Sequence, residues 1–325
     1  MRGKLIGRPT IWLMTSSTPD LTVNVGGLRM ANPVTVASGT FGYGQEYERY
    51  FDVAKLGAVT TKSISLEPRT GNRPPRIVET PAGMLNAIGL QNAGIDGYLR
   101  EKVPFLREKG VPIIANIVGK SPEEYAALAE RLESEDAADA IEANLSCPNV
   151  HDAKRARGAR IVAQDPEAVL LFTQAVRAAT RLPVFIKLTP NVVDITLTAL
   201  AAEEGGASAV CLINTLLGMS IDIVTRRPHL ANIVGGLSGP AIRPVAVKMV
   251  WDAARVLSIP IIGMGGVCCG ADAVQFMLAG AAAVAVGTMS FRQPDAALRV
   301  VSELSEYMKA HGLDSVSQLT GAIKV

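Results

Sequence analysis

The sequence predicts one α/β domain built as a (β/α)8 barrel. Three observations lead to this prediction: a short apolar strand pattern occurs eight times, helical patterns lie between the strands, and the glycine pairs come late in the chain. A doubly wound sheet is the main competitor, but it needs about six strands and usually carries one glycine fingerprint near its start. The barrel therefore agrees better with the 325 residues.

The predicted barrel strands are short and apolar on both faces, as is typical of fully buried parallel strands. In chain order they are Val34–Ser38, Ala58–Ser63, Pro112–Ile117, Ala140–Leu145, Val184–Leu188, Ala209–Asn214, Pro260–Met264 and Ala283–Gly287. The clearest helices between them are Pro122–Ser134, Pro166–Arg181, Pro240–Leu257 and Ala271–Ala279. Ser121 is the expected N-cap of the first of these helices, and Asp165 precedes the second.

Three further segments complete the predicted domain. Leu21–Pro33 alternates around Gly26-Gly27, which predicts a β-hairpin that closes the barrel floor. The connections Ile64–Gly97 and Thr215–Gly239 are too long for simple turns, so we expect long βα loops over the active site with small elements of their own. Residues 1–20 are expected to form a disordered N-terminal extension, with Met14 as an alternative start, and residues 21–325 form the single barrel domain.

Composition excludes several classes of protein. With 48% hydrophobic and 19% charged residues, the chain is that of a folded protein. A net charge of +2 and 5% aromatic residues argue against nucleic acid and anionic lipid as partners. No apolar run reaches the ~18 residues of a membrane span. Four cysteines do not make a disulfide framework, so the predicted compartment is the reducing cytoplasm.

A polar residue or a glycine closes every predicted strand. In a (β/α)8 barrel the active site forms at the carboxyl ends of the strands. The residues found there are Ser38-Gly39, Lys62-Ser63, Asn116, Asn144 to Asn149, Lys187, Asn214-Thr215, Gly265-Gly266 and Gly287-Thr288. The glycines after the last two strands let backbone amides approach a ligand, which indicates a phosphorylated ligand.

Two lysines in this set need an explanation. Lys187 lies in an apolar strand, where a buried cation is costly without an anionic partner. It could stabilise negative charge on a cofactor or form a Schiff base, and Lys62 raises the same question. Together with the side-chain amides, the lysines predict a planar, anionic, amide-containing ligand.

The cysteines divide into one candidate for catalysis and three structural residues. Cys147 precedes a proline in a loop at a strand end, a position suited to an acid or base. Cys211 lies inside a strand and is predicted to be core, and the pair Cys268-Cys269 is predicted to be structural. The histidines His151, His229 and His311 lack zinc spacing, so no metal site is predicted.

At this point the motifs resemble those of a known family. NLSCPN at Asn144–Asn149 and NAIGLQN at Asn86–Asn92 resemble the dihydroorotate dehydrogenases, and the match runs in order from about residue 21 to the C-terminus. It includes Thr61-Lys62-Ser63, Ile186-Lys187-Leu188, Ile213-Asn214-Thr215 and Gly235–Pro240. Within the family the chain is most similar to class 1B, the branch that passes electrons to NAD through a partner subunit. The resemblance implies an FMN-binding barrel that oxidises dihydroorotate to orotate in pyrimidine (UMP) biosynthesis.

The resemblance also assigns roles by position. Cys147 would be the base that removes a ring proton, with hydride passing to FMN, and Lys187 would lie against the flavin and support its reduced, anionic form. The substrate would be held by Lys62, Asn86, Ala87, Ile88, Gly89, Leu90, Asn144, Asn214 and Thr215. FMN would be held by Ser38, Lys62, Ser63, Asn116, Asn144, Lys187, Ile213, Gly239, Gly265, Gly266, Gly287 and Thr288, the last four around its phosphate. The family further implies a homodimer and a partner subunit with FAD and an iron–sulfur centre.

One segment departs from the family pattern, and it leaves the substrate open. After Cys-Pro-Asn-Val, residues 151–160 have fewer glycines and four more cations than the glycine-rich lid that the family carries there. Three alternatives stay beside dihydroorotate oxidation. They are a related FMN oxidoreductase for dihydrouracil-like rings, a flavin barrel with degraded catalysis that serves as an assembly subunit, and an aldolase-like lyase with Lys187 as its Schiff-base lysine.

Overall fold

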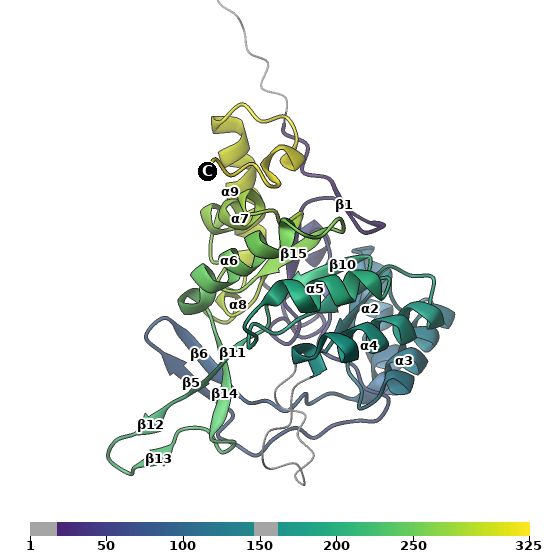
Figure 1. Ribbon diagram of the computed structural model, residues 1–325, viewed down its shortest axis with the longest axis vertical. Coiled ribbons are helices and arrows are strands. Elements are labelled where there is room, and N and C mark those ends of the chain that lie inside the picture. The colour runs from purple at the N-terminus through teal and green to yellow at the C-terminus, as the bar shows by residue number, and fades with distance from the viewer. Residues whose placement is uncertain (1–17, 146–161) are drawn as a thin grey trace, which may run out of the picture.

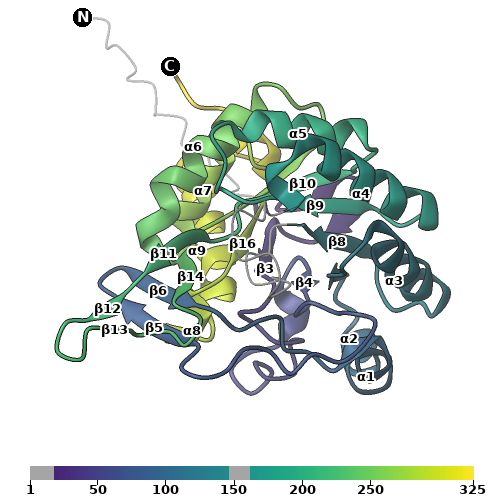
Figure 2. The same cartoon turned by 60° about the horizontal axis from the view of Figure 1, so that its bottom comes forward.

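The structure is a computed structural model, and it describes residues 18–145 and 162–325. Eight parallel strands form one sheet in the order β3-β16-β15-β10-β9-β8-β7-β4. Its end strands β3 and β4 approach each other, since the Gly57 N–H donates to the Val34 carbonyl (2.9 Å) and the Thr35 hydroxyl donates to the Ala58 carbonyl (3.0 Å). The sheet is therefore nearly closed, and the predicted (β/α)8 barrel, or TIM barrel, is confirmed (Figure 2).

Each predicted strand contains one barrel strand of the structure. The barrel strands are β3 (Val34–Val36), β4 (Val59–Thr60), β7 (Ile113–Ile117), β8 (Ala140–Asn144), β9 (Val184–Lys187), β10 (Ala209–Leu212), β15 (Ile261–Met264) and β16 (Ala283–Val286). The largest difference from the prediction is β4, which pairs with β7 over two residues only, before the chain leaves the ladder. The barrel strands have two to five residues each, so the residues that follow them lie at the carboxyl end of the barrel.

Helices surround the barrel (Figures 1 and 2). They are α1 (Gly94–Glu101), α2 (Val103–Lys109), α3 (Pro122–Ser134), α4 (Pro166–Ala179), α5 (Ile195–Glu204), α6 (Arg243–Ala254), α7 (Gly270–Leu278), α8 (Met289–Arg292) and α9 (Ala296–Ala310), with 3-10 turns at Val53–Lys55, Val162–Gln164, Pro240–Ile242 and Val316–Leu319. The Ser121 side chain caps α3 as predicted, by accepting from the Glu124 N–H. The predicted helix from Pro240 to Leu257 is instead a 3-10 turn followed by α6. Pro244 has no N–H to donate, so an α-helix accommodates it only in its first turn.

The core has two layers, one on each face of the sheet. Outward side chains such as Ile141 and Ala143 pack beneath the helices, whereas Ala140 and Phe185 belong to a separate cluster inside the barrel. Side chains therefore alternate between the two layers along each strand. This alternation determines which polar side chains point into the barrel.

A hairpin closes the amino-terminal end of the barrel, as predicted. It consists of β1 (Val23–Val25) and β2 (Leu28–Met30), and its buried side chains join the inner cluster. Gly26 at its turn has φ +56°, and a Cβ added there would lie 2.2 Å from the Ser208 carbonyl oxygen, just before β10. The turn therefore packs directly against the floor of the barrel. Of the predicted extension, the structure describes residues 18–20, and Asp20 bonds to the backbone of Asp314 and Val316.

The two long connections build a second, smaller sheet. Its strands are β5 (Ile77–Thr80), β6 (Gly83–Asn86), β11 (Leu216–Met219) and β14 (Val234–Ser238), in the antiparallel order β11-β14-β6-β5. The hairpin of β12 (Ile221–Asp222) and β13 (Arg227–Pro228) projects from it (Figure 1). The expectation that these connections carry elements of their own is confirmed. Among the described residues, no helix is long and apolar enough to cross a membrane.

Candidate active site

Polar side chains occupy the inside of the barrel at the carboxyl ends of β7, β8 and β9. Asn116, Glu142, Asn144 and Lys187 are all at most 6% exposed. They alternate with apolar residues that face the helices, so they point into the barrel. The strand register pairs Asn116 with Glu142 and Asn144 with Lys187, which places the four side chains at neighbouring positions. Three of the four were predicted site residues; Glu142 was not.

A hydrogen-bonded chain links three strand ends. The Ser63 hydroxyl donates to the Asn116 side-chain carbonyl (2.5 Å), and the Asn116 amide donates to a Glu142 carboxylate oxygen (2.5 Å). The same Glu142 oxygen lies 3.7 Å from the Lys187 ammonium nitrogen. Lys187 therefore has the anionic partner that its burial requires, and that partner comes from the adjacent strand.

Glu142 could have been found from the sequence by the argument used for Lys187. It is an acidic residue within a buried apolar run, and such a residue needs a partner just as a buried lysine does. The pairing itself depends on the register of β8 and β9, which the local pattern does not contain. The thiol of Cys211 also faces Glu142, and burial together with this carboxylate raises the pKa of the thiol well above its usual value. Cys211 is completely buried inside the barrel, as predicted for a core residue.

The amides of Asn144 and Asn214 meet across the barrel end. The Asn214 amide nitrogen lies 3.3 Å from the Asn144 side-chain oxygen, and the Thr215 N–H donates to the Asn214 side-chain oxygen (2.8 Å). The Asn191 amide in turn donates to the Thr215 carbonyl (3.1 Å). The predicted substrate residues Asn144, Asn214 and Thr215 are thus brought together, on the same side of the barrel as Lys187.

Glycines from two separate parts of the chain meet here: Gly265 and Gly266 follow β15, and Gly239 lies just before the 3-10 turn that leads into α6. Gly265 and Gly266 have φ of +122° and +84°, conformations that L side chains rarely adopt. A Cβ added to Gly266 would lie 2.8 Å from the Gly239 carbonyl oxygen, and one on Gly265 would lie 3.4 Å from the Ile213 side chain. The predicted cofactor residues Ile213, Gly239, Gly265 and Gly266 therefore form one cluster of closely packed backbone.

The last strand completes this side of the site. The Thr288 hydroxyl donates to the Ser238 hydroxyl (2.8 Å), which connects the end of β16 to the loop that holds Gly239. The Ala37 N–H donates to the Val286 carbonyl (2.9 Å), and a Cβ on Gly287 would contact the Ala37 side chain. Ser38, Gly287 and Thr288 are thus neighbours at the junction of β16 and β3.

Lys62 lies half-buried just after β4. The backbone N–H of Lys62 donates to the Gly42 carbonyl (2.8 Å). Burial lowers the pKa of Lys62, the nearby Glu46 opposes this shift, and the cation of Arg76 adds to it. Two cations near one another and a partly desolvated ammonium favour a bound anion at this position.

The segment Asn86 to Leu90 starts at the last residue of β6 in the small sheet and continues beyond it, and it is not part of a barrel strand. The Asn86 amide donates to the Gly236 carbonyl of β14 (3.3 Å), while the Asn72 N–H and side chain donate to the carbonyls of Ile88 and Ala87. The structure thus connects this segment to the loop that begins at Asn214 through β14. Cys147 and the atypical loop 151–160 lie outside the described residues.

The pair Cys268-Cys269 is next to the glycine cluster. The Cys268 thiol donates to the Gly266 carbonyl (3.5 Å), and burial is the main cause that raises its pKa. Within residues 18–145 and 162–325, no group of three or more His, Cys, Asp or Glu side chains is placed to hold a metal ion.

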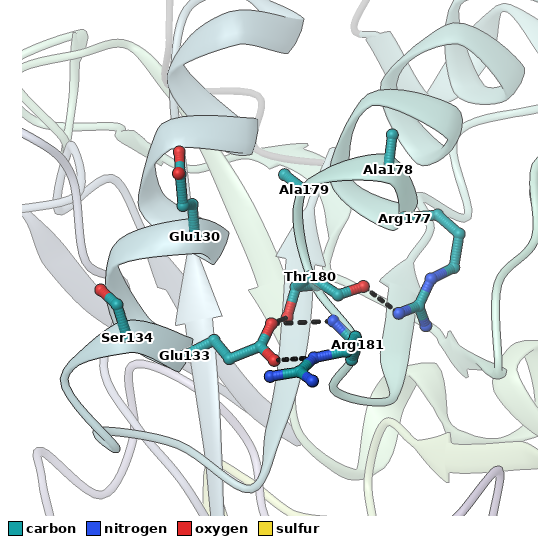
Figure 3. A pocket seen from close by; sticks show the side chains of 8 residues that line it. All are labelled: Glu130, Glu133, Ser134, Arg177, Ala178, Ala179, Thr180 and Arg181. Carbon is teal, nitrogen blue, oxygen red and sulfur yellow. Dashed lines mark hydrogen bonds and ion pairs between the residues drawn. The ribbon is translucent and has the colours of Figure 1, made fainter.

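A surface hollow, whose lining side chains Figure 3 shows, is separate from this chemistry. It lies between the last turns of α3 and α4, at the amino end of β9. There Glu133 accepts hydrogen bonds from the Thr180 hydroxyl (2.7 Å), the Arg181 N–H (2.8 Å) and the Arg181 guanidinium (2.9 Å). These bonds lower the pKa of Glu133 to about 2, and the bond from the Thr180 hydroxyl contributes most. The arrangement joins two helices to a strand and is structural.

Comparison with known proteins identifies the family. The family model described as dihydroorotate dehydrogenase matches residues 20–308. A protein of Geobacter sulfurreducens named "Dihydroorotate dehydrogenase B (NAD(+)), catalytic subunit" is 51% identical over 307 residues, which are 94% of this chain and 99% of that protein. A protein of the same name from Pelobacter propionicus is 50% identical over 306 residues, again 94% and 99% of the two chains.

A solved structure agrees in fold. The crystal structure of the dihydroorotate dehydrogenase of Eimeria tenella in complex with ferulenol has a TM-score of 0.77 to this chain, at 24% sequence identity, and covers 95% of this chain and 90% of its own. The similarity in fold and the extended sequence matches lead to one conclusion. The chain belongs to the dihydroorotate dehydrogenase family of oxidoreductases.

Proposed function

We propose that this chain is the catalytic subunit of an FMN-dependent enzyme that oxidises dihydroorotate to orotate in pyrimidine biosynthesis. The observation that carries the proposal is the polar end of the barrel. A buried lysine, Lys187, lies there beside the amide groups of Asn116 and Asn144, within a chain of this family. A planar ring with carbonyl and imide groups suits a pocket of buried amides and one cation.

The residues present fit FMN at two places. At the ring end, Lys187 is only 4% exposed, and among the described residues its one ion-pair partner is Glu142. An ammonium has three N–H donors, so this pairing leaves donors for a ligand. At the phosphate end, Gly265 and Gly266 expose backbone where any side chain would collide, and Gly287 and Thr288 lie at the start of α8. Bare backbone N–H groups are the usual partners of a phosphate at this end of a barrel.

In the proposed site each residue has a defined task. FMN, when bound, supplies the acceptor for a hydride from the substrate ring. Lys187 donates to the ring and stabilises the negative charge that reduction places there. Ser63 and Asn116, which bond to each other, would hold the ring. Ser38, Ile213 and Gly239 would also contact the cofactor.

The substrate is held by groups from several loops. Asn144, Asn214 and Thr215 form the connected set that faces the substrate ring, and the backbone of Asn86 to Leu90 approaches it from the small sheet. Lys62 binds the substrate carboxylate, since its charge lies half-buried near Arg76. Cys147, assigned by resemblance, removes the ring proton.

The proposal includes partners. The named relatives are catalytic subunits of NAD-dependent enzymes. We infer that this chain likewise passes its electrons to NAD through a second subunit, one that carries FAD and an iron–sulfur centre, and that the catalytic chains pair as a homodimer. The proposed compartment is the cytoplasm.

Anaerobic titration of the purified chain with dihydroorotate tests the function, with the flavin absorbance as the signal. Bleaching at stoichiometric substrate is the expected result. A yellow protein that dihydrouracil bleaches and dihydroorotate does not would replace the proposed substrate by the uncharged ring. Flavin that neither compound bleaches would favour a barrel with degraded catalysis. A colourless protein that does not take up FMN would remove the oxidoreductase proposal, and borohydride trapping of Lys187 would then test the lyase.

A further inference from the structure

Glu142 is a buried carboxylate that the proposed reaction does not use. Its side chain is 2% exposed, and it points into the barrel from the middle of β8. The Asn116 amide and the Lys187 ammonium, both proposed to face the flavin, are its neighbours from the two adjacent strands. A lone buried carboxylate is strongly unfavourable, so its presence in this layer needs a reason.

Charge gives the first part of the reason. The Lys187 ammonium and the Glu142 carboxylate lie 3.7 Å apart inside the barrel, so the pair has no net charge. A lysine alone would present a full positive charge to the ring, with little screening by water. With Glu142 beside it, the two charges largely cancel at the position proposed for the ring.

Position gives the second part. The Glu142 carboxylate accepts from Asn116 at 2.5 Å, and Asn116 accepts from Ser63 at 2.5 Å. An ionised carboxylate only accepts hydrogen bonds, so it determines which end of the Asn116 amide faces it. Glu142 therefore orients Asn116 and holds Lys187 at the same time.

We propose that Glu142 is a positioning residue that offsets the charge of Lys187 and thereby sets how strongly the site prefers reduced over oxidised FMN. This inference rests on the proposed function, because it requires the flavin. Accepting a hydride adds one negative charge to the ring, so the net charge of the residues around it decides the preference. The pair keeps that preference moderate, which suits a flavin that must pass its electrons on.

A set of four proteins separates the two charges. Relative to the wild type, Glu142→Gln adds one positive charge at nearly constant volume, Lys187→Met removes one, and the double variant restores neutrality. The measured quantity is the ratio of the affinities for reduced and oxidised FMN, obtained from an anaerobic equilibrium titration against a reference dye. Glu133→Gln is the matched control, because it removes a hydrogen-bonded carboxylate at the far end of the barrel.

The ratio of the affinities for reduced and oxidised FMN is expected to rise with the net positive charge of residues 142 and 187. Glu142→Gln should raise it at least tenfold, which is about 30 mV for a two-electron couple. Lys187→Met should lower it at least tenfold, and the double variant should stay within threefold of the wild type. Glu133→Gln should leave it unchanged. A Glu142→Gln protein that binds FMN with the wild-type ratio would show that Glu142 serves folding alone.

The double variant keeps the test decisive if a single variant fails to fold. Replacing both members of a buried ion pair by uncharged groups is commonly tolerated, whereas removing one is not. If Lys187 acts without Glu142, the double variant should lose the preference for reduced FMN by tenfold or more, and that result would overturn the proposal. Wild-type protein that binds no FMN would instead refute the proposed function. If dihydroorotate bleaches the wild-type flavin but the affinity ratio is the same in all four proteins, only the role of Glu142 is refuted.

Discussion

Replacing Lys62 by methionine tests how the site recognises its substrate. Methionine keeps most of the apolar stem of lysine and removes the charge. Lys62 is half-buried, burial lowers its pKa, and Arg76 contributes a second cation nearby. A carboxylate seated against such an ammonium is therefore stabilised by a charge that is only partly hydrated.

The magnitude follows from the partial burial. Two unit charges about 4 Å apart interact by about 4 kcal/mol at the effective dielectric constant of ~20 that applies near a protein surface. Loss of hydration from both groups offsets roughly half of this, which leaves about 2 kcal/mol. Because 1.4 kcal/mol corresponds to a factor of ten, the Kd for dihydroorotate should rise about 30-fold.

Anaerobic stopped-flow reduction of the flavin at increasing dihydroorotate concentration measures this Kd together with the limiting rate. The limiting rate should stay within about threefold, since Lys62 is proposed to bind and not to react. Binding of dihydrouracil, which lacks the carboxylate, should hardly change. Lys248→Met, on the exposed face of α6, is the control and should behave as wild type. An unchanged Kd for dihydroorotate, or an equal loss for both rings, would refute the assignment of Lys62 to the carboxylate.

Three more predictions concern the two ends of the barrel. Since the pKa of Glu133 is lowered to about 2, its contribution to stability is complete above about pH 4.5 and is lost as the pH falls toward 2. Glu133→Gln should thus cost about 1 kcal/mol at pH 7 after allowance for its partial exposure, and urea unfolding should show the difference shrinking below pH 4.5. Gly26→Ala should destabilise the fold by about 2–5 kcal/mol, because Gly26 has φ +56° and a Cβ would meet the Ser208 carbonyl at 2.2 Å. Gly110→Ala, with similar φ but open space, should cost only about 1 kcal/mol, and equal thermal shifts would contradict the packing argument. Cys147→Ala should retain FMN yet lose roughly 100- to 10,000-fold in flavin reduction by dihydroorotate, and near-normal turnover would exclude Cys147 as the base.

Local pattern was sufficient for much of the fold. The buried strands, the Ser121 cap and the Gly26-Gly27 hairpin depend on residues close together in the chain, so their sequence signals were direct. Element boundaries depend on more than the apolar pattern. The start of α6 moved to Arg243, because a proline four residues after Pro240 limits where an α-helix can begin.

The pairing within the small sheet is a feature that local sequence pattern does not predict. The sequence predicts that the connections 64–97 and 215–239 carry small elements of their own, yet nothing in either one shows that it pairs with the other. Asn86 and Gly236 are 150 positions apart, and their hydrogen bond exists only because the barrel brings the two loops to the same end. Such pairing depends on the closure of the whole sheet.

The site divides in the same way. Sequence alone was sufficient for the class of fold and for most of the polar residues at the end of the barrel where the chemistry is proposed, because the alternation along a strand and the order of the strands are local properties. Which of those residues are in contact depends on how neighbouring strands pair in the folded protein. The ion pair of Lys187 with Glu142 and the chain from Ser63 through Asn116 arise from the register between neighbouring strands. A shift of one residue in that register would turn every one of these side chains toward the helices, and the polar layer would be lost.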